Sequence, residues 1–122
     1  MSKIVIAANA MIENKNKISD VIQGHHDSEI FFKYNNKYKW SILKRSDGQY
    51  SLMFYPGRQQ LEDLAEMHEE NWVEFDEYVL YDSKELGSKE SIETFKDLYH
   101  VVNDMKYGMD EILDDIIDSM DF

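Results

Sequence analysis

The segment 24–29 holds the residues whose types and spacing come nearest to a chemical site. It reads Gly-His-His-Asp-Ser-Glu and supplies four side chains able to ligate a metal: His25, His26, Asp27 and Glu29. Imidazole and carboxylate groups suit zinc, nickel or iron. Adjacent histidines reach one ion only if the loop bends around it, and this spacing matches no recurrent metal motif. We therefore interpret the segment first as a polar surface turn and second as a metal or small-ligand site.

Acidic side chains gather near the end of the sequence, at Asp110, Glu111, Asp114, Asp115, Asp118 and Asp121. They recur at intervals of three and four with Ile and Leu between them, whereas a calcium loop places its acids at alternate positions around a central glycine. The pattern is typical of the solvated face of an amphipathic helix. Mimicry of a phosphate backbone is the alternative interpretation of these acids.

Sequence signatures of covalent or nucleotide chemistry are missing. The chain has no cysteine, and it contains no nucleophile elbow, phosphate loop or dinucleotide fingerprint. His68, Glu69, Glu70 and His100 are the remaining candidates for general bases, so an enzyme here would be a carboxylate or histidine acid/base catalyst. The sequence favours a non-enzymatic protein, and we expect no cofactor.

Positive charge is concentrated in residues 33–50, KYNNKYKWSILKRSDGQY. Residues 31–60 carry six Lys/Arg and one Asp, net +5, whereas residues 61–122 carry four Lys and twenty acids, net −16, in a chain of net charge −12. Lysines interleaved with aromatics are typical of sheets that bind single-stranded nucleic acid. The acids would repel phosphates over a Debye length of about 8–10 Å, which argues against nucleic acid. Pairing of these cations with acids of the helices is the favoured interpretation.

Length and composition predict a folded single domain over residues 1–122. Hydrophobic residues make up 43% of the 122 and aromatics 13%, more apolar surface than a disordered chain has. The apolar run at residues 4–8 is shorter than the roughly 7–15 residues of a signal sequence, and no apolar stretch approaches the roughly 20 that span a bilayer. With no cysteine, a cytoplasmic location without membrane association is expected.

Hydrophobic periodicity predicts the elements that position these side chains. Period-two alternation over residues 29–55 predicts a three-stranded antiparallel meander, and a fourth strand is predicted near residues 72–81. Helical spacing predicts one or two helices within residues 2–24 with a break at 14–17, and further helices over residues 58–70, 88–108 and 109–120. The expected fold is α+β, with a three- to four-stranded antiparallel sheet packed with N-terminal and C-terminal helices.

The predicted turns divide the meander into two faces. A three-residue loop at 35–37 places Phe32 opposite Trp40, and a two-residue turn at Asp47-Gly48 then adds Met53 and Tyr55 to the Trp40 face. The opposite face is expected to carry Phe31, Lys33, Lys39, Leu43, Arg45, Tyr50, Leu52 and Phe54.

Taken together, these patterns predict a small acidic protein-binding module of the immunity-protein, antitoxin or phage-inhibitor type, which occupies a basic surface of its partner. The candidate partner-binding residues are Phe31, Lys33, Lys39, Tyr50, Phe54, Asp114, Asp115 and Asp118. Three alternatives stay open. One is a homodimer through the sheet face that is expected to carry Phe31 and Phe54, and another is a metal- or ligand-binding protein or enzyme built on residues 25–29. The third is single-strand nucleic-acid binding by the aromatic and basic sheet face.

Overall fold

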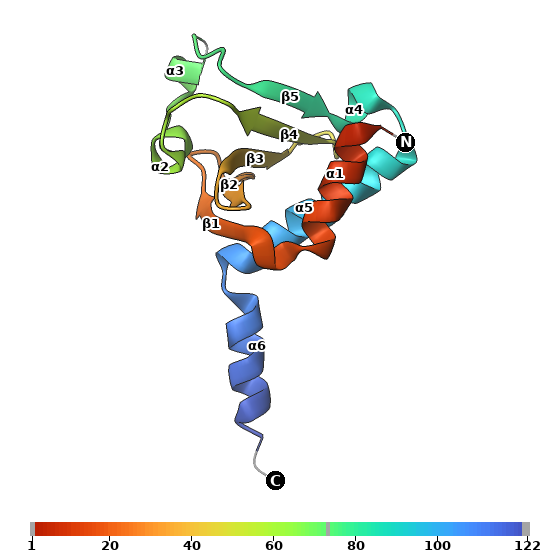
Figure 1. Cartoon of the computed structure of the whole chain (residues 1–122), viewed down its shortest axis with the longest axis vertical. Coiled ribbons are helices and arrows are strands. Elements are labelled where there is room, and N and C mark those ends of the chain that lie inside the picture. Colours follow the sequence, from red (N-terminus) through yellow and green to blue (C-terminus); the bar gives the residue numbers. More distant parts are fainter. Residues whose placement is uncertain (1, 73, 121–122) are drawn as a thin grey trace.

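A computed structural model describes residues 2–72 and 74–120, and these residues form an α+β fold. Its strands make one antiparallel sheet in the order β1-β2-β3-β4-β5 (Figure 1). The strands are β1 (Ile18–Gln23), β2 (Glu29–Tyr34), β3 (Tyr38–Lys44), β4 (Tyr50–Tyr55) and β5 (Val79–Asp82). The predicted fold class is confirmed, with one strand more than the sequence indicates. Val73 lies outside the described residues.

The additional strand is β1, in a segment where the sequence favours a helix. The N-terminal helix is present as α1 (Lys3–Glu13), and a short 3₁₀ turn, η1 (Lys15–Lys17), ends it where a break was expected. A second helix after this break is wrong, because β1 pairs with β2 along the sheet edge. A bulge between Ser19 and Ile22, with Asp20 at φ 51°, shifts the alternation of apolar residues and imitates helical spacing.

Helices α1 and α5 (Lys89–Lys106) cover one face of the sheet (Figure 1). The predicted start of α5 is confirmed, since Ser88 is its N-cap and the Ser88 side chain accepts a hydrogen bond from the Ser91 N–H. The main hydrophobic core lies between these helices and the sheet. Its fully buried members include Ala8, Ile30, Phe32, Ile42, Leu52, Phe95, Leu98 and Val102.

The segment 56–78 covers part of the opposite face and forms a smaller core. The single helix predicted at 58–70 is divided into α2 (Leu61–Ala65) and α3 (Glu69–Trp72). Apolar side chains of α2 pack against the sheet, and the core they form contains Phe31, Tyr55, Leu61, Leu64 and Ala65. Both faces of the sheet are therefore packed, which explains the apolar residues on both sides of β2 and β4.

The register between β3 and β4 differs from the prediction by one residue. The turn has three residues instead of two: the Arg45 N–H donates to the Gln49 carbonyl at 2.8 Å, and Gly48 has φ +83°. Trp40 therefore pairs with Phe54. Because side chains alternate along a strand, this slip exchanges the two faces of β4. Tyr50, Leu52 and Phe54 lie on the Trp40 face, while Met53 and Tyr55 lie on the Phe31 face, the reverse of the prediction. The predicted pairing of Phe32 with Trp40 is confirmed.

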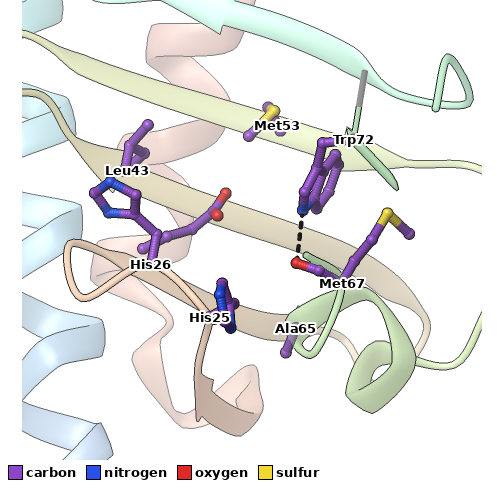
Figure 2. Close-up of a pocket in the computed structure, with 8 residues that line it drawn as sticks. His25, His26, Leu43, Met53, Ala65, Met67 and Trp72 are labelled. Atoms are coloured by element: carbon purple, nitrogen blue, oxygen red, sulfur yellow. Dashed lines mark hydrogen bonds between the residues drawn. The ribbon is translucent and has the colours of Figure 1, made fainter. Parts of the chain in front are cut away.

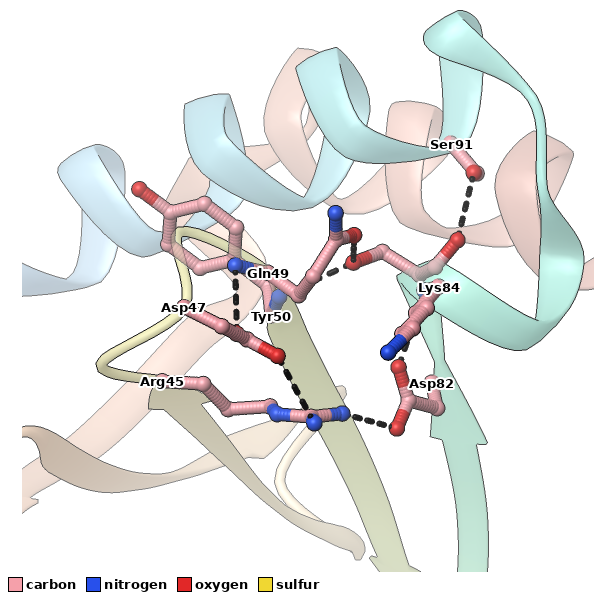
Figure 3. Close-up of polar contacts among 8 residues, drawn as sticks. Arg45, Asp47, Gln49, Tyr50, Asp82, Lys84 and Ser91 are labelled. Atoms are coloured by element: carbon pink, nitrogen blue, oxygen red, sulfur yellow. Dashed lines mark hydrogen bonds and ion pairs between the residues drawn. The ribbon is translucent and has the colours of Figure 1, made fainter.

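The β3–β4 turn is attached to α4 (Ser83–Leu86), which follows β5 (Figure 3). The Arg45 guanidinium pairs with the Asp82 carboxylate at the end of β5. The Ser83 hydroxyl accepts the Tyr50 N–H at 2.9 Å, and all of Ser83 is buried. These contacts hold the edge strand β5 and the helix α4 against the central hairpin.

Candidate functional site

Helix α6 (Met109–Asp118) extends away from the sheet and its packed helices (Figure 1). It follows Gly108, whose φ of +64° separates it from α5. Its apolar stripe is open to solvent, with exposed fractions of 45–60% for Ile112, Leu113, Ile116, Ile117 and, just beyond the helix, Met120. A globular protein normally buries such a stripe, and a large exposed apolar patch marks an interaction surface.

Acidic residues flank the apolar stripe of α6. The predicted partner-binding residues Asp114, Asp115 and Asp118 are all exposed on it, together with Asp110 and Glu111. The sequence of α6 contains no basic residue. A ten-residue helix is marginal in water unless its apolar face packs, and Asp118 at its C-terminal end opposes the helix dipole. Docking onto another surface would therefore stabilise α6. Asp121 lies outside the described residues.

A second candidate site is a cavity of about 400 Å³ on the Phe31 face of the sheet. Figure 2 shows Leu43 and His26 on one side of it, with Met67 and Trp72 facing them. The other lining residues are His25, Glu29, Met53 and Ala65. Cavities of this volume with mostly apolar walls and a few polar groups are typical of small-ligand sites.

The loop between β1 and β2 is held in place at the cavity rim by hydrogen bonds to backbone carbonyls. The His25 N–H donates to the Ala65 carbonyl at 2.7 Å, which joins the loop to the end of α2. The amide group of Gln23 donates to the carbonyls of His26 and Asp27 at 2.8 and 3.1 Å. On the facing side, the Trp72 indole N–H donates to the Met67 carbonyl at 3.1 Å. The rim is thus built before any ligand enters.

Glu29 is the acidic residue that lines this cavity, and it is only 8% exposed. Its carboxylate accepts a 2.9 Å hydrogen bond from the Ser41 hydroxyl, which is itself 2.7 Å from the Tyr55 hydroxyl. Burial raises the pKa of Glu29, and the Ser41 hydrogen bond and the charge of His26 only partly oppose this effect. Burial likewise raises the pKa of Tyr55, so its hydroxyl keeps its proton. Burial of the carboxylate therefore outweighs the groups that stabilise its ionised form.

The structure brings together part of the predicted metal loop. His25, His26 and Glu29 line the same cavity, while Asp27 is exposed and only its backbone carbonyl has a partner in the loop, the Gln23 amide. The His68 ring lies 4.5 Å from the His25 ring, a neighbour that the sequence did not indicate. Within residues 2–72 and 74–120, no three His, Asp or Glu side chains are arranged to hold a metal ion.

The sheet residues predicted to bind a partner occupy other places. Phe31 and Tyr50 are buried in the two cores, with exposed fractions of 1% and 4%, so neither offers its ring to a partner. Phe54 lies on the Trp40 face, with 5.0 Å between the two ring centroids, because of the register described above. It is half-buried there and lines an apolar groove beside α1.

Three of the cations on or next to the sheet strands, Lys33, Lys39 and Arg45, have partners within the chain. The Lys33 ammonium lies 3.4 Å from the Asp20 carboxylate, and the Lys39 ammonium donates to the Gly57 carbonyl at 2.6 Å. Arg45 pairs with Asp82, as described above. Pairing of these cations was expected, but with acids of the helices. Their partners are instead Asp20 on β1, the carbonyl of Gly57 in a loop, and Asp82 at the end of β5.

Sequence reasoning missed most of the cavity walls. Met53 comes from β4, while Met67 and Trp72 come from the segment after α2, and only the register of β4 and the division of the 58–70 helix bring these side chains to one place. No protein-family model matches the chain, and neither a curated protein nor a solved structure matches it significantly. Function is therefore inferred from geometry.

The described helices set one further limit. Among them, no helix combines the length and the apolar composition needed to cross a membrane.

Proposed function

We propose that the chain is a small, non-enzymatic protein-binding module that acts through α6. The observation that carries this proposal is the open apolar stripe of α6, flanked by acids, on a helix that leaves the body of the protein (Figure 1). Helices of this kind bind by laying their apolar face into a hydrophobic groove, with anchors three or four residues apart. Ile112, Ile116 and Leu113 have that spacing.

The partner has a groove rimmed by Lys and Arg. Asp110, Asp114 and Asp118 lie beside the stripe and would meet positive charge at such a rim. A second copy of α6 would bring the same acids against one another without a base in the helix, so self-association is disfavoured. The net charge of −12 also speeds encounter with a basic protein.

The biological role that fits this chemistry is that of an immunity protein, antitoxin or phage-encoded inhibitor. Such a protein covers a basic surface of its target, including one that otherwise binds nucleic acid. We place this role in the cytoplasm, in keeping with a chain that has no cysteine. Direct binding of nucleic acid by the sheet gains no support, since Lys33, Lys39 and Arg45 have partners within the chain.

The experiment is an affinity capture from the native host, followed by affinity measurements with the purified partner at several salt concentrations. The acid variant is Asp114→Asn, Asp115→Asn and Asp118→Asn combined. We expect at least a tenfold loss of affinity and a weaker dependence on salt, because the lost contacts are electrostatic. The apolar variant, Ile116→Ser with Ile117→Ser, should lose affinity and keep the salt dependence.

The matched control removes three acids from α5, at Glu90, Glu93 and Asp97, which are exposed like those of α6. This variant has the same net charge as the acid variant, so it should keep the affinity if the α6 surface is the binding site. Unchanged affinity in the acid variant of α6 would contradict the proposal. A dimer in sedimentation of the chain alone, lost in the apolar variant, would assign the stripe to a homodimer instead.

A further inference from the structure

The cavity on the Phe31 face has chemistry that α6 does not share. Its walls are the half-buried side chains of Leu43, Met53, Met67 and Trp72, and a carboxylate lies among them. We propose that this cavity binds a small organic ammonium, a primary amine on an apolar or aromatic body, with Glu29 as its anionic partner. This site is independent of α6 and of the proposed protein partner.

The carboxylate is positioned by the strands. Ser41 on β3 donates to Glu29 Oε2 at 2.9 Å, and Tyr55 on β4 fixes the Ser41 hydroxyl at 2.7 Å. The ionised carboxylate accepts several hydrogen bonds, so one bond from Ser41 leaves capacity for a donor from the cavity. An ammonium has three donors and a full charge, which a hydroxyl lacks.

The charges around Glu29 favour a cation over an anion. His25 and His26, from the loop between β1 and β2, line the cavity. Tyr55, from β4, contributes a hydroxyl that burial keeps protonated. The side chains from the α2–α3 segment that line the cavity are Ala65, Met67 and Trp72, which do not titrate. Glu29 is therefore the group that gives the cavity its negative charge when it is ionised.

The walls suit the body of such an amine. Met53 and Met67 carry flexible, polarisable thioethers that adapt to different apolar shapes. Trp72 presents the ring type that attracts cations most strongly, and its indole is held in place by the 3.1 Å bond to the Met67 carbonyl. Burial raises the pKa of Glu29 because the ionised carboxylate loses its hydration there, and a bound ammonium would stabilise the ionised form.

The test compares 2-phenylethylamine with its uncharged counterpart 2-phenylethanol at pH 7.5. Binding is followed by NMR through the Trp72 indole N–H and the Glu29 amide resonances. In the wild-type chain we expect the amine to bind at least tenfold more tightly than the alcohol, since a charge-assisted hydrogen bond replaces a neutral one. 3-Phenylpropionate, which has the same ring and a negative charge, should bind more weakly than either.

Two variants locate the charge that selects the amine. Glu29→Gln keeps the shape and a hydrogen-bond acceptor, and we expect the preference for the amine to fall to near one. Asp27→Asn removes a charge from the same loop but outside the cavity, and the preference should be retained. Equal binding of amine and alcohol to the wild type, undiminished amine binding to Glu29→Gln, or no shift of the Trp72 resonance with any probe would overturn the proposal.

Discussion

Ser41 holds the carboxylate of Glu29 through a 2.9 Å hydrogen bond between Ser41 Oγ and Glu29 Oε2, and both residues are buried. The pair joins β2 to β3 on the Phe31 face, next to the ligand cavity. A carboxylate in this position costs stability whenever it is ionised, because one hydrogen bond does not replace its lost hydration. The pair therefore connects the stability of the fold to pH.

The first prediction concerns this pH dependence. Burial raises the pKa of Glu29 in the folded chain, so above the pKa of the unfolded chain there is a range of pH where only the folded state keeps the proton. In that range the unfolded state binds fewer protons, and the free energy of unfolding falls as pH rises. Glu29→Gln removes this effect. The free energy of unfolding of Glu29→Gln relative to that of the wild type should rise from about pH 4 and level off above the pKa of Glu29 in the folded chain. The total rise should be about 1.4 kcal/mol for each unit by which the folded and unfolded pKa values differ.

Urea unfolding of both proteins at a series of pH values measures this difference. Asp27→Asn is the control, because Asp27 is exposed in the same loop. Its difference from the wild type should stay nearly constant across the range. A Glu29→Gln difference that is equally flat would show that the carboxylate is not buried in solution.

The β3–β4 hairpin shows how far the sequence leads and where it fails. Alternation predicted the strands, and the first hairpin has the predicted pairing of Phe32 with Trp40. The predicted register of the second hairpin was wrong by one residue. Asp47-Gly48 is typical of a two-residue turn, but Gly48 is the third residue of a three-residue turn. Both faces of β4 are apolar, so hydrophobicity could not choose between the registers.

The two candidate sites differed in predictability for a related reason. The acids of α6 were visible in sequence because they lie on one helix, and local spacing decides which face they share. The cavity depends on contacts between segments far apart, such as the bond from the His25 N–H to the Ala65 carbonyl. Sequence spacing alone does not contain those contacts.

A second prediction tests the turn that sets the register. Gly48 has φ +83°, and a Cβ there would meet nothing within 4 Å, so the cost of a side chain comes from the backbone alone. Gly48→Ala should lower the free energy of unfolding by about 1–2 kcal/mol, and Gly48→Asn by less, because Asn adopts positive φ more readily. Thermal unfolding compares the two variants. Equal stability of the Ala and Asn variants would argue against a left-handed residue at this position.

A third prediction concerns the attachment of α4. The buried Ser83 hydroxyl accepts the Tyr50 N–H at 2.9 Å and donates to the Gln49 side chain at 2.8 Å. Ser83→Ala leaves the buried Tyr50 N–H without its acceptor, which should cost about 1–3 kcal/mol in urea unfolding. Ser46→Ala, at an exposed position of the neighbouring turn, is the control and should change stability by less than about 0.5 kcal/mol. Equal effects of the two substitutions would contradict the contact.

The last prediction separates α6 from the body of the protein. Ile116 and Ile117 are 58% and 60% exposed, whereas Leu98 on α5 is fully buried. Ile116→Ala with Ile117→Ala should change the free energy of unfolding by less than about 0.5 kcal/mol, while Leu98→Ala should cost about 2–5 kcal/mol through the cavity it leaves. Urea unfolding of the isolated chain measures both. A loss of 2 kcal/mol or more in the double variant would mean that α6 packs against its own chain, and its apolar stripe would then be unavailable to a partner. A small loss, together with weaker partner capture by an α6 variant, would show that these isoleucines serve binding and contribute little to folding.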